Sequence, residues 1–284
     1  MSLNINFIGA GSLGKTIGKL LVGSGNYKVN NILNTNITSS KAACEFIGHG
    51  TPIESINELT HADITFITTP DEKIAYILNE LVKENKINKE SLIIQCSGII
   101  SSEELKSSIK APLKLASIHP IKSFADPKIA FDTFKGTHCA FEGDEEAFLL
   151  IKDMFESIGG IVFKIDSQKK ALYHAGCAIS SNFTVTITDI ASKCFQDSGI
   201  EKKLALELAN QLVLGAAKNI KKLKSTNKAL TGPIKREETS TIAKHLKSIN
   251  DDKLIKVYKA LVENTLYLAN SSPKFKKAVS DLIK

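Results

Sequence analysis

The pattern of apolar and polar positions changes character past the middle of the chain. Before residue 166, short runs of β-branched residues alternate with segments that repeat apolar residues every three to four positions. This pattern predicts strands at residues 4–9, 28–33, 64–68, 92–95, 115–119, 138–142 and 161–164. It predicts helices at residues 12–22, 39–47, 71–83 and 145–158. Alternation of this kind is typical of βαβ units in a largely parallel sheet.

From residue 167 onward the pattern is helical only. Apolar residues at three-to-four spacing predict helices at residues 172–194, 204–223, 239–246 and 254–269. The chain has 284 residues, which is enough for two domains. We therefore expect an α/β domain over residues 1–165 and an all-α domain over residues 166–284.

A glycine-rich turn follows the first predicted strand. The strand leads directly into a GxGxxG motif, after which a helix begins, in the sequence Gly9-Ala10-Gly11-Ser12-Leu13-Gly14. Gly9 permits a tight turn, Gly11 lets the backbone approach a pyrophosphate, and Gly14 lets helix and strand pack closely. The helix N-terminus adds free N–H groups and a positive dipole end. A dinucleotide site is expected here rather than a glycine turn without a ligand.

The residues at the end of the second strand determine whether a dinucleotide site of this type prefers NAD or NADP. An NAD site usually has an acidic residue there, which accepts hydrogen bonds from the ribose. No acid occurs between Gly9 and Cys44. The segment offers polar and basic side chains instead: Asn34, Thr35, Ser39 and Lys41. This composition suits a 2′-phosphate, so NADP is preferred over NAD as the cofactor.

Three later strand ends carry further candidate residues. Ligands of open α/β sheets lie at the carboxyl ends of strands. The three segments found there are Thr68-Thr69-Pro70, Ser97-Gly98 and His119-Pro120. Each one alone is consistent with an ordinary turn. Together they predict the wall of a nicotinamide pocket, with Ser97 near both cofactor and substrate and His119 as a catalytic candidate.

Charge and cysteine content narrow the class of protein. Residues 1–165 hold 16 lysines against 19 acids, a net charge of −3, whereas residues 166–284 hold 21 basic residues against 11 acids, a net charge of +10. The lysines of the second part lack interleaved aromatic residues, so a solvated face is favoured over a nucleic-acid surface. Five dispersed cysteines without a CxxC pair argue against disulfides and a zinc site. We expect a cytoplasmic protein without membrane spans.

These motifs resemble a known family. The glycine loop, Thr69-Pro70-Asp71, Ser97-Gly98 and His119-Pro120 are similar to those of Rossmann proteins that carry a helical C-terminal domain of unknown function 2520. The resemblance continues in the segments 172–175, 180–183 and 230–236. The family belongs with 6-phosphogluconate dehydrogenase, 3-hydroxyisobutyrate dehydrogenase, ketopantoate reductase and pyrroline-5-carboxylate reductase. The resemblance implies a doubly wound Rossmann domain, an NAD(P)-dependent oxidoreductase and a homodimer formed through the helical domain.

One position departs from the hydroxyacid dehydrogenases of that superfamily. They place a lysine, which acts as general acid or base, four residues before a helix asparagine. Counting back four residues from Asn182 gives Ala178. His174 lies seven and eight residues before Ser181 and Asn182, so we expect the three residues on one helical face. His174 then takes the acid role, or the substrate is an imine that needs less acid catalysis. A purely structural role for His174 and Asn182 stays open.

The basic half contains the chain's one arginine. Arg236 follows the turn Thr231-Gly232-Pro233, and its guanidinium matches a carboxylate with two parallel donors. We expect Arg236 and Thr231 to bind an anionic substrate group, with a structural role for the arginine as the alternative. Glu237 and Glu238 follow the arginine where relatives commonly have Gly-Asp.

Two functional classes stay open. The first is an NADPH-dependent reductase of a small carboxylate-bearing carbonyl or imine. The second is an NADP-binding sensor or regulatory protein without turnover, which the missing lysine at position 178 keeps under consideration.

Overall fold

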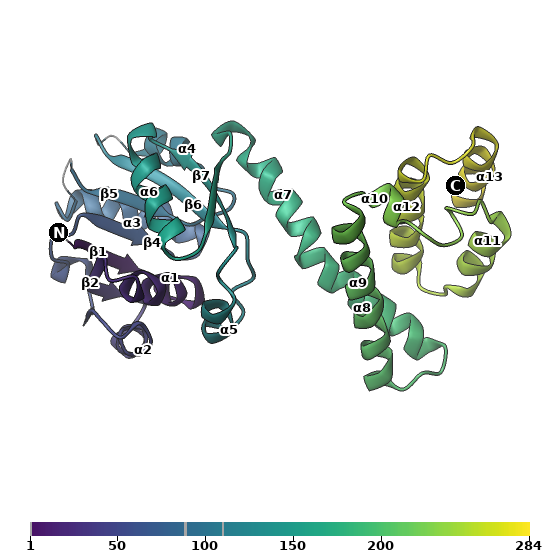
Figure 1. Cartoon of the computed structure of the whole chain (residues 1–284), viewed down its shortest axis with the longest axis horizontal. Helices are drawn as coiled ribbons and strands as arrows, with labels where there is room; N and C mark the ends of the chain where they lie inside the picture. Colours follow the sequence, from purple (N-terminus) through teal and green to yellow (C-terminus); the bar gives the residue numbers. More distant parts are fainter. Residues whose placement is uncertain (1, 88–89, 110) are drawn as a thin grey trace. The chain divides into compact units, whose positions relative to one another are not determined.

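The computed structural model describes residues 2–87, 90–109 and 111–284 (Figure 1). The described chain divides into two compact units, of which the first ends at Ser181 and the second begins at Asn182. Each unit is built around its own buried side chains.

The first unit contains a mixed sheet. Its strands are β1 (Leu3–Ile8), β2 (Tyr27–Leu33), β3 (Thr51–Ile53), β4 (Ile64–Ile67), β5 (Leu92–Gln95), β6 (Lys114–Pro120), β7 (His138–Gly143) and β8 (Ile161–Lys164). Their order across the sheet is β3-β2-β1-β4-β5-β6-β7-β8 in the described residues. Neighbouring strands pair in parallel, except that β6 and β7 are antiparallel. The predicted mostly parallel α/β domain is thereby confirmed.

Helices connect these strands. They are α1 (Ser12–Gly23), α2 (Ile37–Ile47), α3 (Asp71–Lys83), α4 (Ser102–Ser108), α5 (Pro127–Asp132), α6 (Glu145–Ser157) and α7 (Lys170–Ser180), with short 3-10 turns η1 (Ile56–Glu58) and η2 (Ser167–Lys169). Asn36, Ser101 and Asp126 cap α2, α4 and α5, because their side chains accept hydrogen bonds from first-turn N–H groups.

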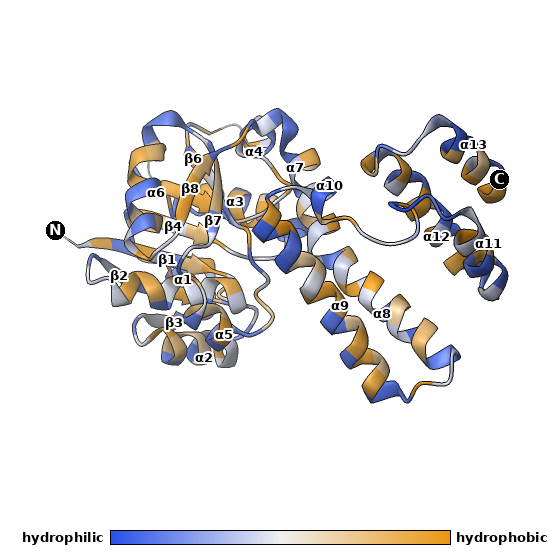
Figure 2. Ribbon diagram, turned by 45° about the vertical axis from the view of Figure 1, so that its right-hand side comes forward, coloured by the Kyte–Doolittle hydropathy of each residue, from blue (hydrophilic) through white to orange (hydrophobic). Residues whose placement is uncertain are grey.

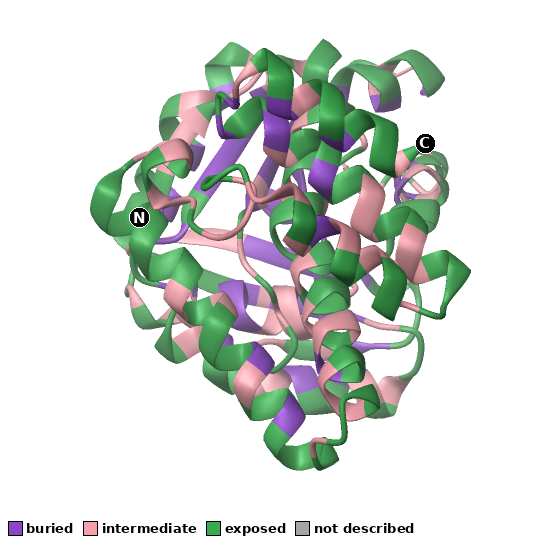
Figure 3. Cartoon of the chain, turned by 90° about the vertical axis from the view of Figure 1, so that its right-hand side faces the viewer, coloured by how far each residue is buried: buried purple, intermediate pink, exposed green. Residues whose placement is uncertain are grey.

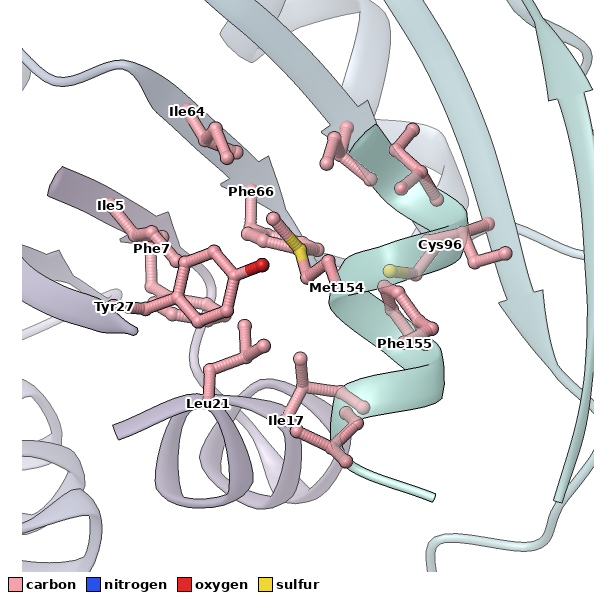
Figure 4. Close-up of a cluster of buried hydrophobic side chains, with 14 of the residues drawn as sticks. Ile5, Phe7, Ile17, Leu21, Tyr27, Ile64, Phe66, Cys96, Met154 and Phe155 are labelled. Atoms are coloured by element: carbon pink, nitrogen blue, oxygen red, sulfur yellow. The ribbon is translucent and has the colours of Figure 1, made fainter. Parts of the chain in front are cut away.

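Both faces of the sheet are covered by apolar side chains. Phe7 and Phe66 stack at 5.0 Å between ring centroids and belong to one core, with Ile17 and Leu21 of α1 and Met154 of α6 (Figure 4). The strand residues that follow the two phenylalanines belong to the opposite core, together with apolar residues of α3 and α4: Ile8, Ile67, Ile74, Leu78 and Leu105. Figure 3 shows buried residues along the strands and exposed residues on the outer helices. Such double burial explains why these strands are almost uniformly apolar.

The second unit is entirely helical in the described residues. It contains α8 (Asn182–Asp197), α9 (Lys202–Leu223), α10 (Thr226–Ala229), α11 (Thr239–Ser248), α12 (Asp252–Leu268) and α13 (Pro273–Ile283). Helices α8 and α9 lie side by side (Figures 1 and 2). A small core joins α11, α12 and α13 through Ile242, Val262, Leu266, Phe275 and Val279. The predicted all-α C-terminal part is confirmed.

The structure corrects the predicted helix over residues 172–194. It contains two helices, α7 and α8, with Ser181 between them in a φ of −112° and a ψ of −72°. His174 and Asn182 therefore do not share one unbroken helix. Strand β3 and helices α4, α5, α10 and α13 were not predicted. All but α13 are at most seven residues long, which is too short for a periodic pattern to stand out.

The boundary between the units lies later in the chain than the change of pattern. Strands give way to helices between Lys164 and Ser167, where the domain boundary was predicted. The first compact unit nevertheless extends to Ser181, so that α7 belongs with the sheet. Polar contacts attach α7 to the strands, among them those of Lys170 with Glu142 and of Tyr173 with His119.

Candidate functional site

The glycine loop between β1 and α1 has the conformation that its sequence predicts. Gly9 has a φ of +85°, and its N–H donates to the Leu33 carbonyl at 2.8 Å. A Cβ atom on Gly9 would lie 2.3 Å from Cγ2 of Thr69. Only glycine fits there, because both the backbone angle and the neighbouring side chain exclude larger residues.

Gly11 and Gly14 differ in their surroundings. A Cβ on Gly14 would lie 2.5 Å from Oγ1 of Thr68, so this glycine allows α1 to pack closely against the end of β4. A Cβ on Gly11 would have only one neighbour, the Gly9 carbonyl oxygen at 3.9 Å. Gly11 precedes the first residues of α1, Ser12 and Leu13, and no side chain caps this helix end and no acid lies in its first turn. The N-terminus of α1 is thus open to an anion.

The end of β2 carries a polar network. The side-chain amide of Asn34 donates to the Ser39 carbonyl at 2.9 Å, and the Ser39 hydroxyl donates to the Asn36 carbonyl at 2.8 Å. Thr35 and Lys41 are exposed. The segment from Asn34 to Lys41 contains hydroxyl and ammonium groups and no carboxylate, which fits a phosphate better than a ribose diol.

The three residues after β4 have different roles. Thr68 donates its hydroxyl proton to the Gly9 carbonyl at 3.0 Å, which ties the end of β4 to the glycine loop. Thr69 Oγ1 is buried, and it has no hydrogen-bond partner among the described residues. Pro70 is exposed and precedes α3. A buried hydroxyl without a partner beside Gly9 is consistent with a polar ligand atom completing this site.

Two imidazoles pack on a glycine at the end of β5. A Cβ on Gly98 would lie 2.4 Å from Cδ2 of His174 and 2.9 Å from Nε2 of His119. The two imidazole ring centroids are 5.9 Å apart. On its other side, Nδ1 of His119 shares a hydrogen bond of 2.7 Å with the Tyr173 hydroxyl. The structure therefore brings together His119 from β6 and His174 from α7, as the sequence predicts for catalytic residues of one site.

His119 is held neutral by its surroundings. Burial lowers the pKa of His119 to about 4, with smaller contributions from His174 and Lys170, while Asp71 acts in the opposite direction. An imidazole with such a pKa carries no charge at pH 7. The neutral ring of His119 can accept or donate a hydrogen bond, but at pH 7 it does not carry the extra proton that a general acid donates.

Ser97 is occupied within its own turn. Its hydroxyl oxygen accepts hydrogen bonds from the N–H groups of Ile99 and Ile100 at 3.1 and 3.0 Å. The side chain is buried, and its role in the structure is to shape the turn after β5. Its hydroxyl proton is still available as a donor.

A buried ion pair between α7 and β7 was missed from the sequence. Nζ of Lys170 lies 2.8 Å from Oε1 of Glu142, and the two side chains are 1% and 2% exposed. Nothing in the apolar pattern marks Lys170, since it is one of many lysines near a helix end. Tyr173 was also missed as a site residue, although the segment that contains it supported the family resemblance.

The remaining predicted residues lie in the sequence at the boundary between the two units, or within the second unit. Ser181 and Asn182 are both exposed at the break between α7 and α8. Thr231 is exposed in the second unit. Arg236 forms an ion pair with Glu238, with Nε 2.6 Å from Oε1, and its side chain is 60% exposed. Binding of a substrate anion by Arg236 and Thr231 stays a prediction.

The acids after Arg236 tie the loop to the helices of the second unit. Glu237 has a φ of +57°, and its carboxylate accepts hydrogen bonds from the Ser272 N–H and hydroxyl at 2.6 and 2.8 Å. Glu238 accepts from Thr241 in the first turn of α11 at 3.2 Å. The loop therefore has a defined conformation that holds the guanidinium at the surface.

Two family models match the chain. Residues 4–98 match the family described as NADP oxidoreductase, coenzyme F420-dependent, and residues 137–265 match the domain of unknown function DUF2520. The chain is an oxidoreductase with a DUF2520 domain. The resemblance predicted from its motifs is confirmed. The DUF2520 match of this oxidoreductase begins before β7, so it includes α7 and the buried Lys170–Glu142 pair.

Solved structures share the fold of this oxidoreductase. Protein TM1727 from Thermotoga maritima is 28% identical over 94% of this chain and 98% of that chain, with a TM-score of 0.73. Protein BF3122 from Bacteroides fragilis, provisionally named an NADP oxidoreductase, is 19% identical with the same coverage and a TM-score of 0.73. A Plasmodium falciparum pyrroline carboxylate reductase with NADP bound is 14% identical over 99% of this chain and 95% of that chain, with a TM-score of 0.59.

No curated protein matches the chain significantly. Among the described residues, no helix is both long and apolar enough to cross a membrane.

Proposed function

We propose that this oxidoreductase is an NADPH-dependent reductase that acts on a small carboxylate-bearing carbonyl or imine. The observation that carries the proposal is the pair of imidazoles, His119 and His174, packed on Gly98 at the carboxyl ends of the strands. They belong to the same compact unit as the glycine loop. A dinucleotide loop and a proton-transferring group at one sheet edge are the two parts that a reductase of this type needs.

The residues of the loop fit a dinucleotide. The uncapped N-terminus of α1 suits the pyrophosphate, and the lack of a side chain at Gly11 leaves room for it. The unpartnered Thr69 hydroxyl supplies a further polar contact beside the loop. When bound, the cofactor supplies the hydride, while the chain binds and orients it.

We further propose that NADP is preferred over NAD. Support comes from the end of β2, where the exposed Thr35 and Lys41 provide a hydroxyl donor and a positive charge without a competing carboxylate. In this proposal the Ser39 hydroxyl turns from the Asn36 carbonyl to the phosphate. A 2′-phosphate gains from these groups, whereas the ribose of NAD finds no acidic acceptor there.

The imidazoles account for the proton that reduction requires. Hydride addition at carbon leaves a negative charge on the oxygen of a carbonyl or on the nitrogen of a neutral imine, and that atom must receive one proton. His174 is the donor in this proposal, because His119 is neutral and engaged with Tyr173. A protonated imine substrate would ask less of His174, because its nitrogen already carries the proton.

The proposed substrate contacts come from residues after α7. Ser181 and Asn182 follow the helix that bears His174, and their exposed polar side chains suit a substrate group. Arg236 and Thr231 are assigned to the substrate's carboxylate, for which a guanidinium is the matching partner. In that role Arg236 exchanges its Glu238 partner for the substrate anion.

The decisive experiment follows NADPH absorbance in the presence of a panel of keto acids and cyclic imines. Steady oxidation by the wild type and its loss in His174→Gln would support the proposal. Tight NADPH binding without turnover across the whole panel would contradict it, and would favour an NADP-dependent sensor. Binding is measured separately by calorimetry, so that a folded but inactive protein is recognised.

We also propose that the protein is a homodimer formed through its helical unit. Large apolar side chains are exposed on the paired helices α8 and α9, among them Phe183 at 55%, Val185 at 71% and Leu212 at 64%. The ribbon in Figure 2 shows apolar residues, coloured orange, along both helices. A soluble single chain rarely leaves so many apolar side chains in water. Light scattering of the full chain tests this, and a monomer at micromolar concentration would refute it.

A further inference from the structure

Lys170, the first residue of α7, has a complete set of buried acceptors. Its ammonium group donates to the Ile100 carbonyl at 2.6 Å, to Oγ of Ser117 at 2.5 Å and to Oε1 of Glu142 at 2.8 Å. An ammonium has three protons, so each acceptor uses one. The acceptors come from three separate places: the loop after β5, strand β6 and strand β7.

Glu142 is equally well satisfied. Besides Lys170, its carboxylate accepts from the Ser102 N–H at 3.0 Å and from the Ser102 hydroxyl at 2.6 Å. Glu142 also stands opposite Ser117 in the antiparallel β6–β7 ladder. The ion pair thus joins α7, α4 and two strands at one buried point.

The residues of this ion-pair cluster lie close in the sequence to the two imidazoles. Ser117 lies two residues before His119 on β6, so both side chains leave the same face of the sheet. Tyr173 and His174 lie three and four residues after Lys170, on the same face of α7. The face of α7 that is fixed by the ion pair is therefore the face that contacts His119.

We propose that Lys170 is a positioning residue, whose ion pair with Glu142 holds the first turn of α7 against the strand ends and thereby sets Tyr173 and His174 on His119. Of the two measurements that test this role, only the kinetic one rests on the proposed reductase function. The other, an NMR titration of His119, depends on the surroundings of that ring and not on turnover.

The positioning role of Lys170 can be tested through the pKa of His119, because charged groups surround this ring. The groups that influence its titration are His174 and Lys170 on α7 and Asp71 on α3. Lys170 itself is influenced by Glu142, Cys96 and Asp71, and burial lowers its pKa while Glu142 raises it. Removing the ammonium should let His119 take up a proton more readily. Removing the Glu142 charge alone should have the same effect, because it breaks the ion pair and leaves the buried ammonium without its counter-charge.

The experiment compares three variants of the full chain. Lys170→Met/Glu142→Leu removes both charges and keeps the site apolar, since a buried ion pair can be replaced by apolar residues without loss of the fold. Glu142→Gln breaks the ion pair while it keeps the size of the side chain and leaves Lys170 present. Lys169→Met is the matched control, because Lys169 is the neighbouring residue, its side chain is 75% exposed and its partner Asp166 is 3.5 Å away.

NMR titration of the His119 ring is the first measurement. We expect His119 to stay neutral down to about pH 5 in the wild type and in Lys169→Met, and to protonate at higher pH in Glu142→Gln and in the double variant, because both of these break the ion pair that holds α7. A purely electrostatic effect of the lost ammonium would raise the titration pH of His119 in the double variant only. A folded double variant with wild-type titration of His119 would overturn the proposal, as would wild-type titration in a folded Glu142→Gln.

Kinetics is the second measurement. In the double variant kcat should fall roughly ten- to a hundred-fold, because displacement of a catalytic group by about 1 Å has effects of this size, while the Kd for NADPH stays near that of the wild type. Unchanged kcat in the double variant would overturn the proposal. If no substrate is found for the wild type, the proposed reductase function fails, and the titration still decides the positioning role.

Discussion

Substitution of Gly11 separates the binding of a dinucleotide from the stability of the fold. At this position φ is −75° and ψ is −153°, angles that residues other than glycine also adopt. The one atom near a new Cβ is the Gly9 carbonyl oxygen, at 3.9 Å. Gly11→Val should therefore still fold, with a loss of stability of at most about 1 to 2 kcal/mol, because Gly11 is the N-cap of α1 and valine is a poorer N-cap than glycine.

Binding of the dinucleotide should be affected more strongly than the stability of the fold. The space in front of Gly11 is where the proposed pyrophosphate approaches the N-terminus of α1. Loss of one charge-assisted hydrogen bond from the loop costs about 1.5 to 3 kcal/mol, which is roughly ten- to a hundred-fold in Kd. Displacement of the whole pyrophosphate by a valine side chain should cost more. Calorimetry with NADPH and thermal unfolding of the same samples measure both quantities.

Two other glycines serve as controls for Gly11. A Cβ on Gly14 would lie 2.5 Å from Thr68 Oγ1, so Gly14→Ala should destabilise the fold by about 1 to 3 kcal/mol through overpacking. A Cβ on Gly23, the last residue of α1, has no neighbour within 4 Å, so Gly23→Ala should leave binding unchanged and should stabilise the helix by at most about 1 kcal/mol. Undiminished NADPH affinity in Gly11→Val would refute the assignment of this loop to the cofactor.

Three further predictions concern the cofactor, the substrate and pH. NADPH should bind more tightly than NADH in calorimetry, with a gap that narrows in high salt and in Lys41→Gln; equal affinities at low salt would exclude recognition of the 2′-phosphate. Arg236→Lys should raise the substrate KM roughly ten- to a hundred-fold while Tm and NADPH affinity stay unchanged, and a drop in Tm would instead indicate a structural role. Because the pKa of His119 falls from 6.5 to about 4 on folding, the unfolded chain binds more protons between these values, and stability is lost as pH falls through that window. The loss amounts to at most about 3 kcal/mol, and it should be smaller in His119→Gln when unfolding is measured at pH 7.5 and pH 5; an identical pH dependence in the variant would contradict the shift.

Site residues could be predicted from the sequence where their role depends on the conformation of the backbone. Gly9, Gly11 and Gly14 could be assigned individual roles because each role follows from the absence of a side chain at a known place in a strand–turn–helix unit. The long strands and helices were equally predictable, since their apolar periods extend over many residues. The break at Ser181 was not, because the apolar pattern continues across it and only the local backbone angles change.

Side-chain partnerships across the sheet were beyond prediction. Glu142 and Lys170 are 28 residues apart, and nothing in either local sequence indicates that the other is its partner. The same holds for the hydrogen bond between His119 and Tyr173, which are 54 residues apart in the sequence. Such contacts depend on strand order and on the path of α7, which a single sequence does not report.

The attachment of α7 to the sheet restricts how this protein can be recombined with its relatives. A chimera joined at Lys164, where the strands end, would take Lys170 from one parent and Glu142 from another. Unless the incoming helix also begins with a lysine of the same reach, Glu142 would be left as an uncompensated charge inside the sheet unit. A crossover placed after Ser181 keeps the ion pair and both imidazoles from one parent, and it exchanges the second compact unit as a whole.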